Sequence, residues 1–73
     1  MWYYKSSIGV IKIYFNAATN NYALSIDDEV YGFYASPNSA AGDVYTHTTG
    51  CYEWDVSEEL SPETVNEWKF IND

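Results

Sequence analysis

The sequence predicts an α+β fold: a three- to four-stranded antiparallel sheet, one main helix packed on one face, and a short C-terminal helix. Three observations predict it. β-branched and aromatic residues cluster within the first 34 positions, turn-forming residues separate the clusters, and two Ser-Pro pairs, Ser36-Pro37 and Ser61-Pro62, precede segments with helical spacing. Ser is a favourable helix N-cap and Pro is tolerated at the first helical position. We expect residues 1–73 to form a single small acidic domain.

The strands follow from composition and alternation. Residues 8–15 are β-branched and aromatic, which is typical of a strand. Residues 16–21 form a turn, residues 22–26 alternate between apolar and small side chains, residues 27–29 form a polar tip, and residues 30–34 form a third strand. This pattern predicts a three-stranded meander. Residues 2–5 either add a fourth strand at the edge or cover one end.

Residues 40–48 place apolar side chains at helical spacing, which predicts a helix that starts after Ser36 and ends near Gly50. The segment 51–60 is acidic, and we expect it to be irregular or, because Tyr52, Trp54 and Val56 alternate, to pair as a strand. A second, short helix is expected after Ser61-Pro62.

A sheet with one helix leaves its other face open. If Leu24 and Ile26 face the helix, then Tyr14, Tyr31 and Phe33 are expected on the opposite face. An exposed aromatic face of this kind marks an interaction surface. The alternative is that the C-terminal segment covers it, with the side chains of Trp54, Trp68 and Phe70.

The charge is strongly one-sided. Eleven acidic residues face three lysines, arginine is absent, and the formal net charge is −8. Such a surface repels phosphate backbones and attracts basic proteins. We therefore expect no direct nucleic acid partner, no membrane partner, and a basic protein surface as the partner. The predicted partner-binding acids are Asp27, Asp28, Glu29, Glu53, Asp55, Glu58, Glu59, Glu63 and Glu67.

The same acids also have ordinary explanations. Residues 27–29 suit a solvated hairpin tip, and acids near a helix start favour the helix dipole and keep a small protein in solution. Six acids between Glu53 and Glu67, with no basic residue among them, exceed what helix polarity needs.

The sequence gives little support for a catalytic site or a metal site. One histidine and one cysteine are too few for a structural zinc site, which needs about four N or S ligands. Asp43, His47 and Cys51 are each four residues apart and would share a face of an unbroken helix. Gly50 is expected to end that helix before Cys51. We therefore expect no enzyme, no catalytic residues, no metal and no cofactor.

Residues 31–41, Tyr31 to Ala41, resemble the third strand and helix start of AP2-type and integrase-arm-type domains. The resemblance covers roughly residues 8–49. It implies a three-stranded sheet with one packed helix and an open face that binds DNA. Because the basic residues that such domains place on that face are not found here, the DNA-binding function is not carried over.

A second resemblance covers most of the chain and is to small stand-alone bacterial proteins of unknown function. It rests on the segments 26–32, 36–37, 40–41, 43–47, 49–50 and 52–55. It implies no activity.

These observations favour a non-enzymatic acidic interaction protein, an inhibitor or DNA mimic that docks a basic protein surface, by analogy with phage anti-defence and anti-CRISPR proteins. The alternative is a structural module that forms a homodimer or larger homo-oligomer through its aromatic sheet face. A single cysteine suits a reducing compartment, and no signal peptide or apolar span of about 20 residues occurs. We therefore expect a cytoplasmic protein.

Overall fold

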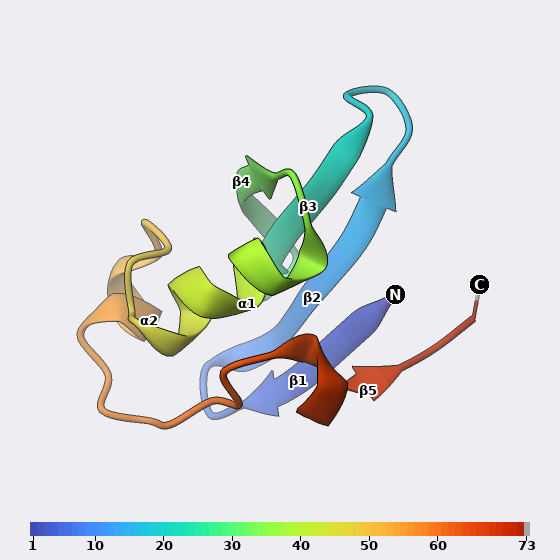
Figure 1. Ribbon diagram of the computed structural model, residues 1–73. Helices are drawn as coiled ribbons and strands as arrows, with labels where there is room; N and C mark the ends of the chain where they lie inside the picture. The colour runs from blue at the N-terminus through green and yellow to red at the C-terminus, as the bar shows by residue number, and fades with distance from the viewer. Residues whose placement is uncertain (73) are drawn as a thin grey trace.

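The computed structural model describes residues 1–72, and Asp73, the last residue of the predicted domain, lies outside them (Figure 1). Within these residues the chain forms a five-stranded antiparallel sheet with the order β4-β3-β2-β1-β5. The helix α1 crosses one face of it. The predicted α+β class is confirmed, with one strand more than the three or four expected. The elements are β1 (Trp2–Ser6), β2 (Gly9–Asn16), β3 (Asn21–Ile26), β4 (Glu29–Tyr34), α1 (Pro37–Tyr45), α2 (Tyr52–Asp55), the 3-10 turn η1 (Val65–Glu67) and β5 (Lys69–Phe70).

The strands β1 to β4 follow one another through hairpins. Asp27 and Asp28 form the β3–β4 turn, and both have positive φ, 52° and 69°. Two successive positive φ values define the type I′ turn, whose twist matches that of the flanking strands. The predicted polar tip is therefore a tight two-residue turn. Residues 2–5 belong to a strand, one of the two expected alternatives, but this strand lies between β2 and β5 and not at the edge.

A β-bulge corrects the predicted sheet face. Leu24 is paired with Gly32 and Ser25 with Val30, so one step along β3 matches two steps along β4, and Tyr31 is the extra residue. Strict alternation placed Tyr31 beside Phe33 on the face opposite α1. Instead, Tyr31 packs against the buried core, and its hydroxyl donates to Glu29 at 2.7 Å.

The helix α1 starts as predicted and ends earlier. The Ser36 side chain accepts from the backbone N–H of Ser39 at 3.1 Å, which caps the helix. Tyr45 is the last helical residue, five positions before Gly50. His47 has a left-handed φ of 58°, which turns the chain toward α2. The buried face of α1 consists of Ala40, Ala41 and Val44.

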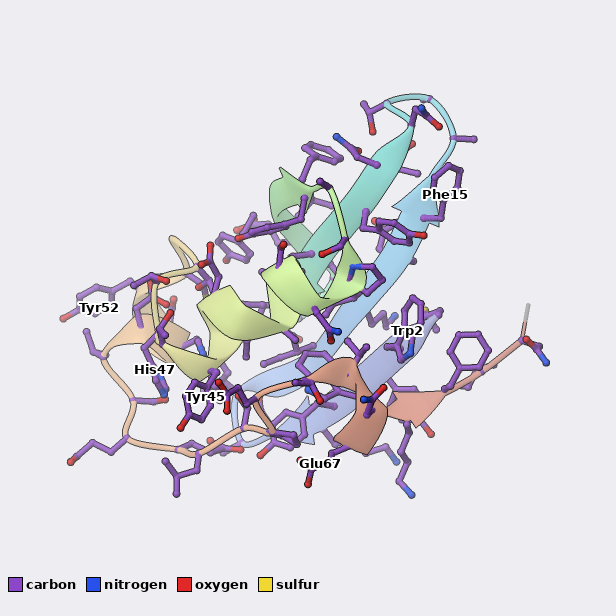
Figure 2. All side chains as sticks on the ribbon, viewed as in Figure 1. Trp2, Phe15, Tyr45, His47, Tyr52 and Glu67 are labelled. Carbon is purple, nitrogen blue, oxygen red and sulfur yellow. The ribbon has the colours of Figure 1, made fainter. Side chains whose placement is uncertain are left out.

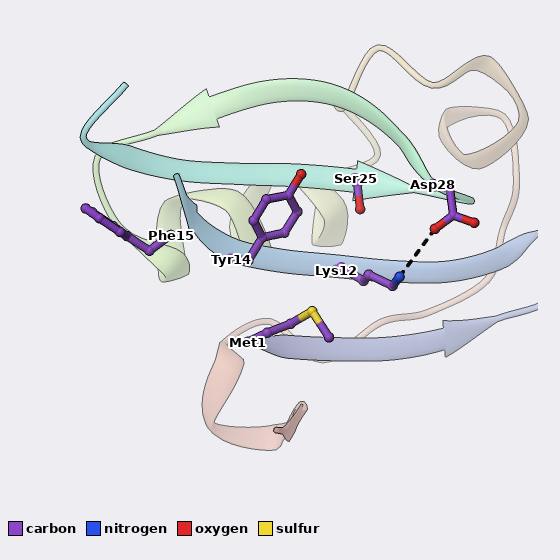
Figure 3. A pocket seen from close by; sticks show the side chains of 6 residues that line it. All are labelled: Met1, Lys12, Tyr14, Phe15, Ser25 and Asp28. Atoms are coloured by element: carbon purple, nitrogen blue, oxygen red, sulfur yellow. Dashed lines mark hydrogen bonds and ion pairs between the residues drawn. The ribbon is translucent and has the colours of Figure 1, made fainter. Parts of the chain in front are cut away.

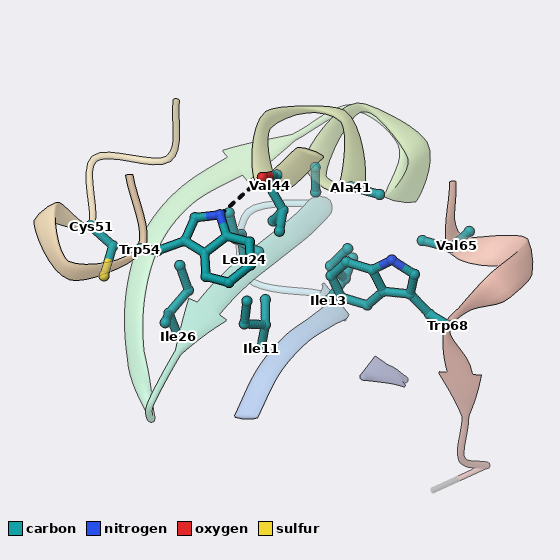
Figure 4. Close-up of a cluster of buried hydrophobic side chains, with 11 residues drawn as sticks. Ile11, Ile13, Leu24, Ile26, Ala41, Val44, Cys51, Trp54, Val65 and Trp68 are labelled. Carbon is teal, nitrogen blue, oxygen red and sulfur yellow. Dashed lines mark hydrogen bonds between the residues drawn. The ribbon is translucent and has the colours of Figure 1, made fainter. Parts of the chain in front are cut away.

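The C-terminal segment joins the core on the α1 side (Figure 4). Trp54 in α2 is fully buried, and its indole N–H donates to the backbone carbonyl of Val44 at 2.9 Å. Trp68 is 6% exposed and closes the other end of the same core. The segment therefore does not cover the opposite sheet face. The expected irregular or strand-like segment around Trp54 is a short helix, and the expected second helix is only the three-residue turn η1.

Candidate interaction surfaces

The sheet face opposite α1, here called the open face, combines aromatic and basic side chains. Directly paired residues project from the same face of a sheet, so the register defines its rows. One row runs across the strands through Lys69, Tyr3, Lys12, Ser25 and Val30, and a second through Tyr14, Ala23 and Phe33. In Figure 3, which views this face, α1 lies behind the sheet. Tyr14 and Phe33 therefore lie on the open face as predicted, and Val30 takes the place expected for Tyr31.

An open pocket of about 450 Å³ lies on this face (Figure 3). Its rim includes Tyr14, Ser25 and Met1. Lys12 donates to the carboxylate of Asp28 at 3.3 Å across the pocket. Phe33 is 49% exposed and Val30 is 44% exposed. The face thus presents apolar area beside charged groups.

The acids gather at the end of the sheet that carries the hairpin turns 7–8 and 27–28. Asp27 and Glu53 line the same small pocket, of about 110 Å³, although they are far apart in sequence. Glu59 accepts from the backbone N–H and the hydroxyl of Ser7 at 3.1 and 2.6 Å, which holds residues 57–60 beside the first turn. We call this region the acidic end, and we define it as Asp27, Asp28 and Glu29 at the second turn, Glu53, and the neighbouring residues Glu58 and Glu59; Asp28 lies at its border, where it pairs with Lys12.

Two of the predicted partner-binding acids hold the fold together. Asp55 accepts from the backbone N–H groups of Thr49 and Gly50 and from the Thr49 hydroxyl. Partial burial raises the pKa of Asp55, but these hydrogen bonds and nearby His47 outweigh it, so the pKa lies below its ordinary value. The hydrogen bonds from Ser7, assisted by Tyr4, likewise lower the pKa of Glu59.

The remaining predicted acids are divided between two places. Glu63 and Glu67 are exposed and belong to the segment that leads into β5. Glu67 lines a pocket of about 250 Å³ together with Lys5 and Lys69. The nine predicted acids therefore do not share one surface: six meet at the acidic end, Asp55 is bound internally, and two lie toward β5.

Sequence reasoning missed an exposed apolar set within the acidic segment 51–60. Tyr52 is 74% exposed, Val56 is 59% exposed and Leu60 is 82% exposed. Tyr52 and Val56 lie one turn apart on α2 and its C-cap. The alternation of Tyr52, Trp54 and Val56 favoured a strand, whereas α2 buries Trp54 and leaves Tyr52 and Val56 exposed.

The spacing of Asp43, His47 and Cys51 does not produce a shared site, because α1 ends between the first two (Figure 2). Asp43 accepts from the hydroxyl of Tyr34 at 2.7 Å. The Cys51 thiol is buried and lies 3.9 Å from a carboxylate oxygen of Glu53. Each of the three groups is engaged by a different neighbour.

The His47 ring connects α2 to Glu59, which follows α2 in the chain. Its ring stacks on Trp54 with centroids 4.7 Å apart. Its Nδ1 lies 2.8 Å from the carbonyl oxygen of Trp54 and its Nε2 lies 2.9 Å from the carbonyl oxygen of Glu59. Carbonyl oxygens only accept, so the ring donates to both only when both nitrogens carry a proton.

Among residues 1–72, no three His, Cys, Asp or Glu side chains are arranged to hold a metal ion. No helix in the described part of the chain is both long and apolar enough to cross a membrane. No protein-family model, curated protein or solved structure matches the chain. The two resemblances noted in the sequence therefore stay predictions.

Proposed function

We propose that this chain is a non-enzymatic interaction protein that docks a basic protein surface through its acidic end. The observation that carries the proposal is the convergence of carboxylates from two distant segments: Asp27 and Glu53 line one pocket, and Glu59 is fixed to the neighbouring turn at Ser7. Carboxylates held close together repel one another and destabilise the folded state. Binding to a basic partner would offset this repulsion.

Rigidity of the acidic end supports the same proposal. The type I′ turn fixes Asp27 and Asp28, and Glu59 and Asp55 anchor the segment 51–60 to the fold. Carboxylates held in place lose less conformational entropy on binding than carboxylates on a mobile tail. Inhibition of a nucleic-acid-binding protein by mimicry of phosphate charge, as in phage anti-defence and anti-CRISPR proteins, is the specific form that we propose.

Capture at low salt tests the proposal. The wild type is compared with Glu53→Gln/Glu58→Gln, which removes two charges from the acidic end, and with Glu63→Gln/Glu67→Gln, which removes two charges toward β5. We expect the wild type and the second variant to retain the same basic protein and the first variant to lose it. Retention by both variants, or by neither, would contradict the assignment of the acidic end.

A salt wash of the captured complex distinguishes this proposal from the alternative, a homo-oligomer held by the open face. Charged contacts at a rim weaken between low and moderate salt because the Debye length falls to about 8 Å at physiological ionic strength. A contact made by Tyr14 and Phe33 alone would persist. We retain this alternative because the Phe33 side chain is 49% exposed.

A cytoplasmic location is part of the proposal. It rests on the single cysteine, Cys51, which is buried and free. Such a residue is typical of proteins from reducing compartments.

A further inference from the structure

All three lysines of the chain project from the open face. Lys12 shares this face with Tyr14 by alternation along β2, and Lys5 is paired directly with Val10 of the same face. Lys69 is paired with Tyr3, which is itself paired with Lys12. The only acidic residue within a described strand is Glu29, whose carboxylate is held by Tyr31 on the core side. Asp28, in the β3–β4 turn, also lines this face and pairs with Lys12 at 3.3 Å, so Lys5 and Lys69 supply the excess of positive charge on this face, in a chain with a net charge of −8.

The side chains between the lysines define what this face can bind. Tyr14 and Phe33 supply apolar area in one row, and Lys69 supplies positive charge in the next, where Lys12 is paired with Asp28. Complementary charge arrangements direct association and fix its register. The matching surface must be anionic and must carry exposed apolar side chains among its acids.

The segment 51–60 of the chain itself has this composition. Glu53 and Glu58 are exposed, and they alternate with the exposed apolar side chains of Tyr52, Val56 and Leu60. The segment follows α1 in the chain and lies on the α1 side of the sheet, so one molecule cannot place it on its own open face (Figure 1). It is available to the open face of another molecule.

We propose that the open face binds the segment 51–60 of a second copy of this chain, head to tail. A twofold contact between two open faces would oppose lysine rows, which like-charge repulsion disfavours. A nucleic acid would meet the acidic end and a net charge of −8 with only three lysines and no arginine to bind it. A head-to-tail contact links copies into a ring or a filament, and in either case the assembled fraction rises with concentration. This inference goes beyond the proposed function, in which the partner is another protein.

Sedimentation velocity over a concentration series at physiological salt tests this inference with the full chain. The face variant is Lys5→Glu/Lys69→Glu, and the segment variant is Glu53→Lys/Glu58→Lys. The control variant Thr19→Lys/Glu63→Lys/Asn66→Lys has the same net charge as the segment variant but leaves both surfaces unchanged. We expect wild type and control to associate with rising concentration, and the face and segment variants to associate about tenfold more weakly.

Mixing provides the decisive step. Equal amounts of the face and segment variants should associate again, because each supplies the surface that the other has lost. Leu60→Ser removes an exposed apolar group without changing the charge, and it should also weaken association. This variant still tests the inference if a charge-reversed variant does not fold. Circular dichroism checks the fold of each variant.

Three results would overturn the inference. Wild type that stays monomeric at every concentration excludes self-association. A segment variant that associates like wild type indicates a contact between open faces. Binding of a single-stranded oligonucleotide to the open face, without self-association, assigns that face to nucleic acid. The experiment uses only this chain, so its outcome is separate from capture of a basic partner.

Discussion

At the residue scale, His47 shows how one side chain joins segments that the sequence does not connect. Its two ring nitrogens bridge the carbonyl oxygens of Trp54 and Glu59, and its ring stacks on the Trp54 indole. The left-handed backbone at His47, which ends α1 early, is the conformation that allows these contacts. His47, which the spacing grouped with Asp43 and Cys51, thus links α2 to Glu59.

We predict that His47→Ala lowers the free energy of unfolding by about 2 kcal/mol, since at least one hydrogen bond and a stacking contact are lost. Urea denaturation followed by tryptophan fluorescence measures this, because Trp54 is buried beside the ring. Exposed Asn66→Ala serves as the control and should change the free energy by no more than about 0.5 kcal/mol. Equal stability of His47→Ala and wild type would refute the structural role.

Glu59 provides a pH-dependent prediction. Its pKa in the folded state lies below the ordinary value of 4.5, chiefly because Ser7 donates hydrogen bonds to the carboxylate. The unfolded chain then binds the proton first as the pH falls, so the stabilisation is present above about pH 4.5 and is lost as the pH falls through the folded pKa.

We therefore expect the stability difference between wild type and Glu59→Gln to be largest at pH 6 and to shrink toward about pH 3. Thermal unfolding at several pH values measures it. Glu58→Gln removes the same charge from the neighbouring exposed position and should differ from wild type by a small amount that does not follow this curve. A difference for Glu59→Gln that is constant with pH would contradict the assignment.

The roles of individual residues were the hardest feature to predict from the sequence. Composition identified the acids, but it could not show that Asp55 and Glu59 are held by Thr49 and Ser7, because these contacts depend on tertiary placement. Nor could alternation place Tyr31, because a bulge shifts the register by one residue and reverses the face.

At the element scale, local signals predicted the first half of the chain well. The strands β2 to β4 and the start of α1 follow from alternation, turn residues and the Ser36 cap, all of which act over a few residues. The C-terminal half depends on burial instead. Trp54 enters the core from a helix and Trp68 enters it beside β5, so tertiary packing overrides the local pattern around both residues.

Two glycines, one in a turn and one in a helix, test where the fold requires glycine. Gly9 begins β2 with a φ of +128°, and a Cβ there would lie 2.8 Å from a carboxylate oxygen of Asp27. Gly42 lies within α1, and a Cβ there would meet nothing within 4 Å. The first turn therefore requires glycine, whereas the helix does not.

We predict that Gly9→Ala destabilises the protein by about 1–3 kcal/mol through backbone strain and the contact with Asp27. Gly42→Ala should stabilise it by about 0.5–1 kcal/mol, because alanine favours the helix. The melting temperatures of the two variants, measured together, should move in opposite directions. A fall for both, or no change for Gly9→Ala, would contradict the geometry of the first turn.

At the scale of the whole molecule, the fold separates most of the charge. The acidic end lies at one end of the sheet, whereas Lys5, Lys12 and Lys69 project from the open face, and the ion pair between Lys12 and Asp28 lies where the two regions meet. The net charge was evident from composition, but this separation was not, because it depends on which segments the hairpins and the C-terminal strand bring together.

The measurement that tests the central claim most directly is the association rate of the captured basic partner, determined by surface plasmon resonance at low and physiological salt. If the acidic end docks that partner, the rate for wild type falls by about tenfold or more as salt rises. The rate for Glu53→Gln/Glu58→Gln is already low and varies less, and Glu63→Gln/Glu67→Gln behaves as wild type. A rate that does not depend on salt, or that the two variants change equally, would contradict the claim.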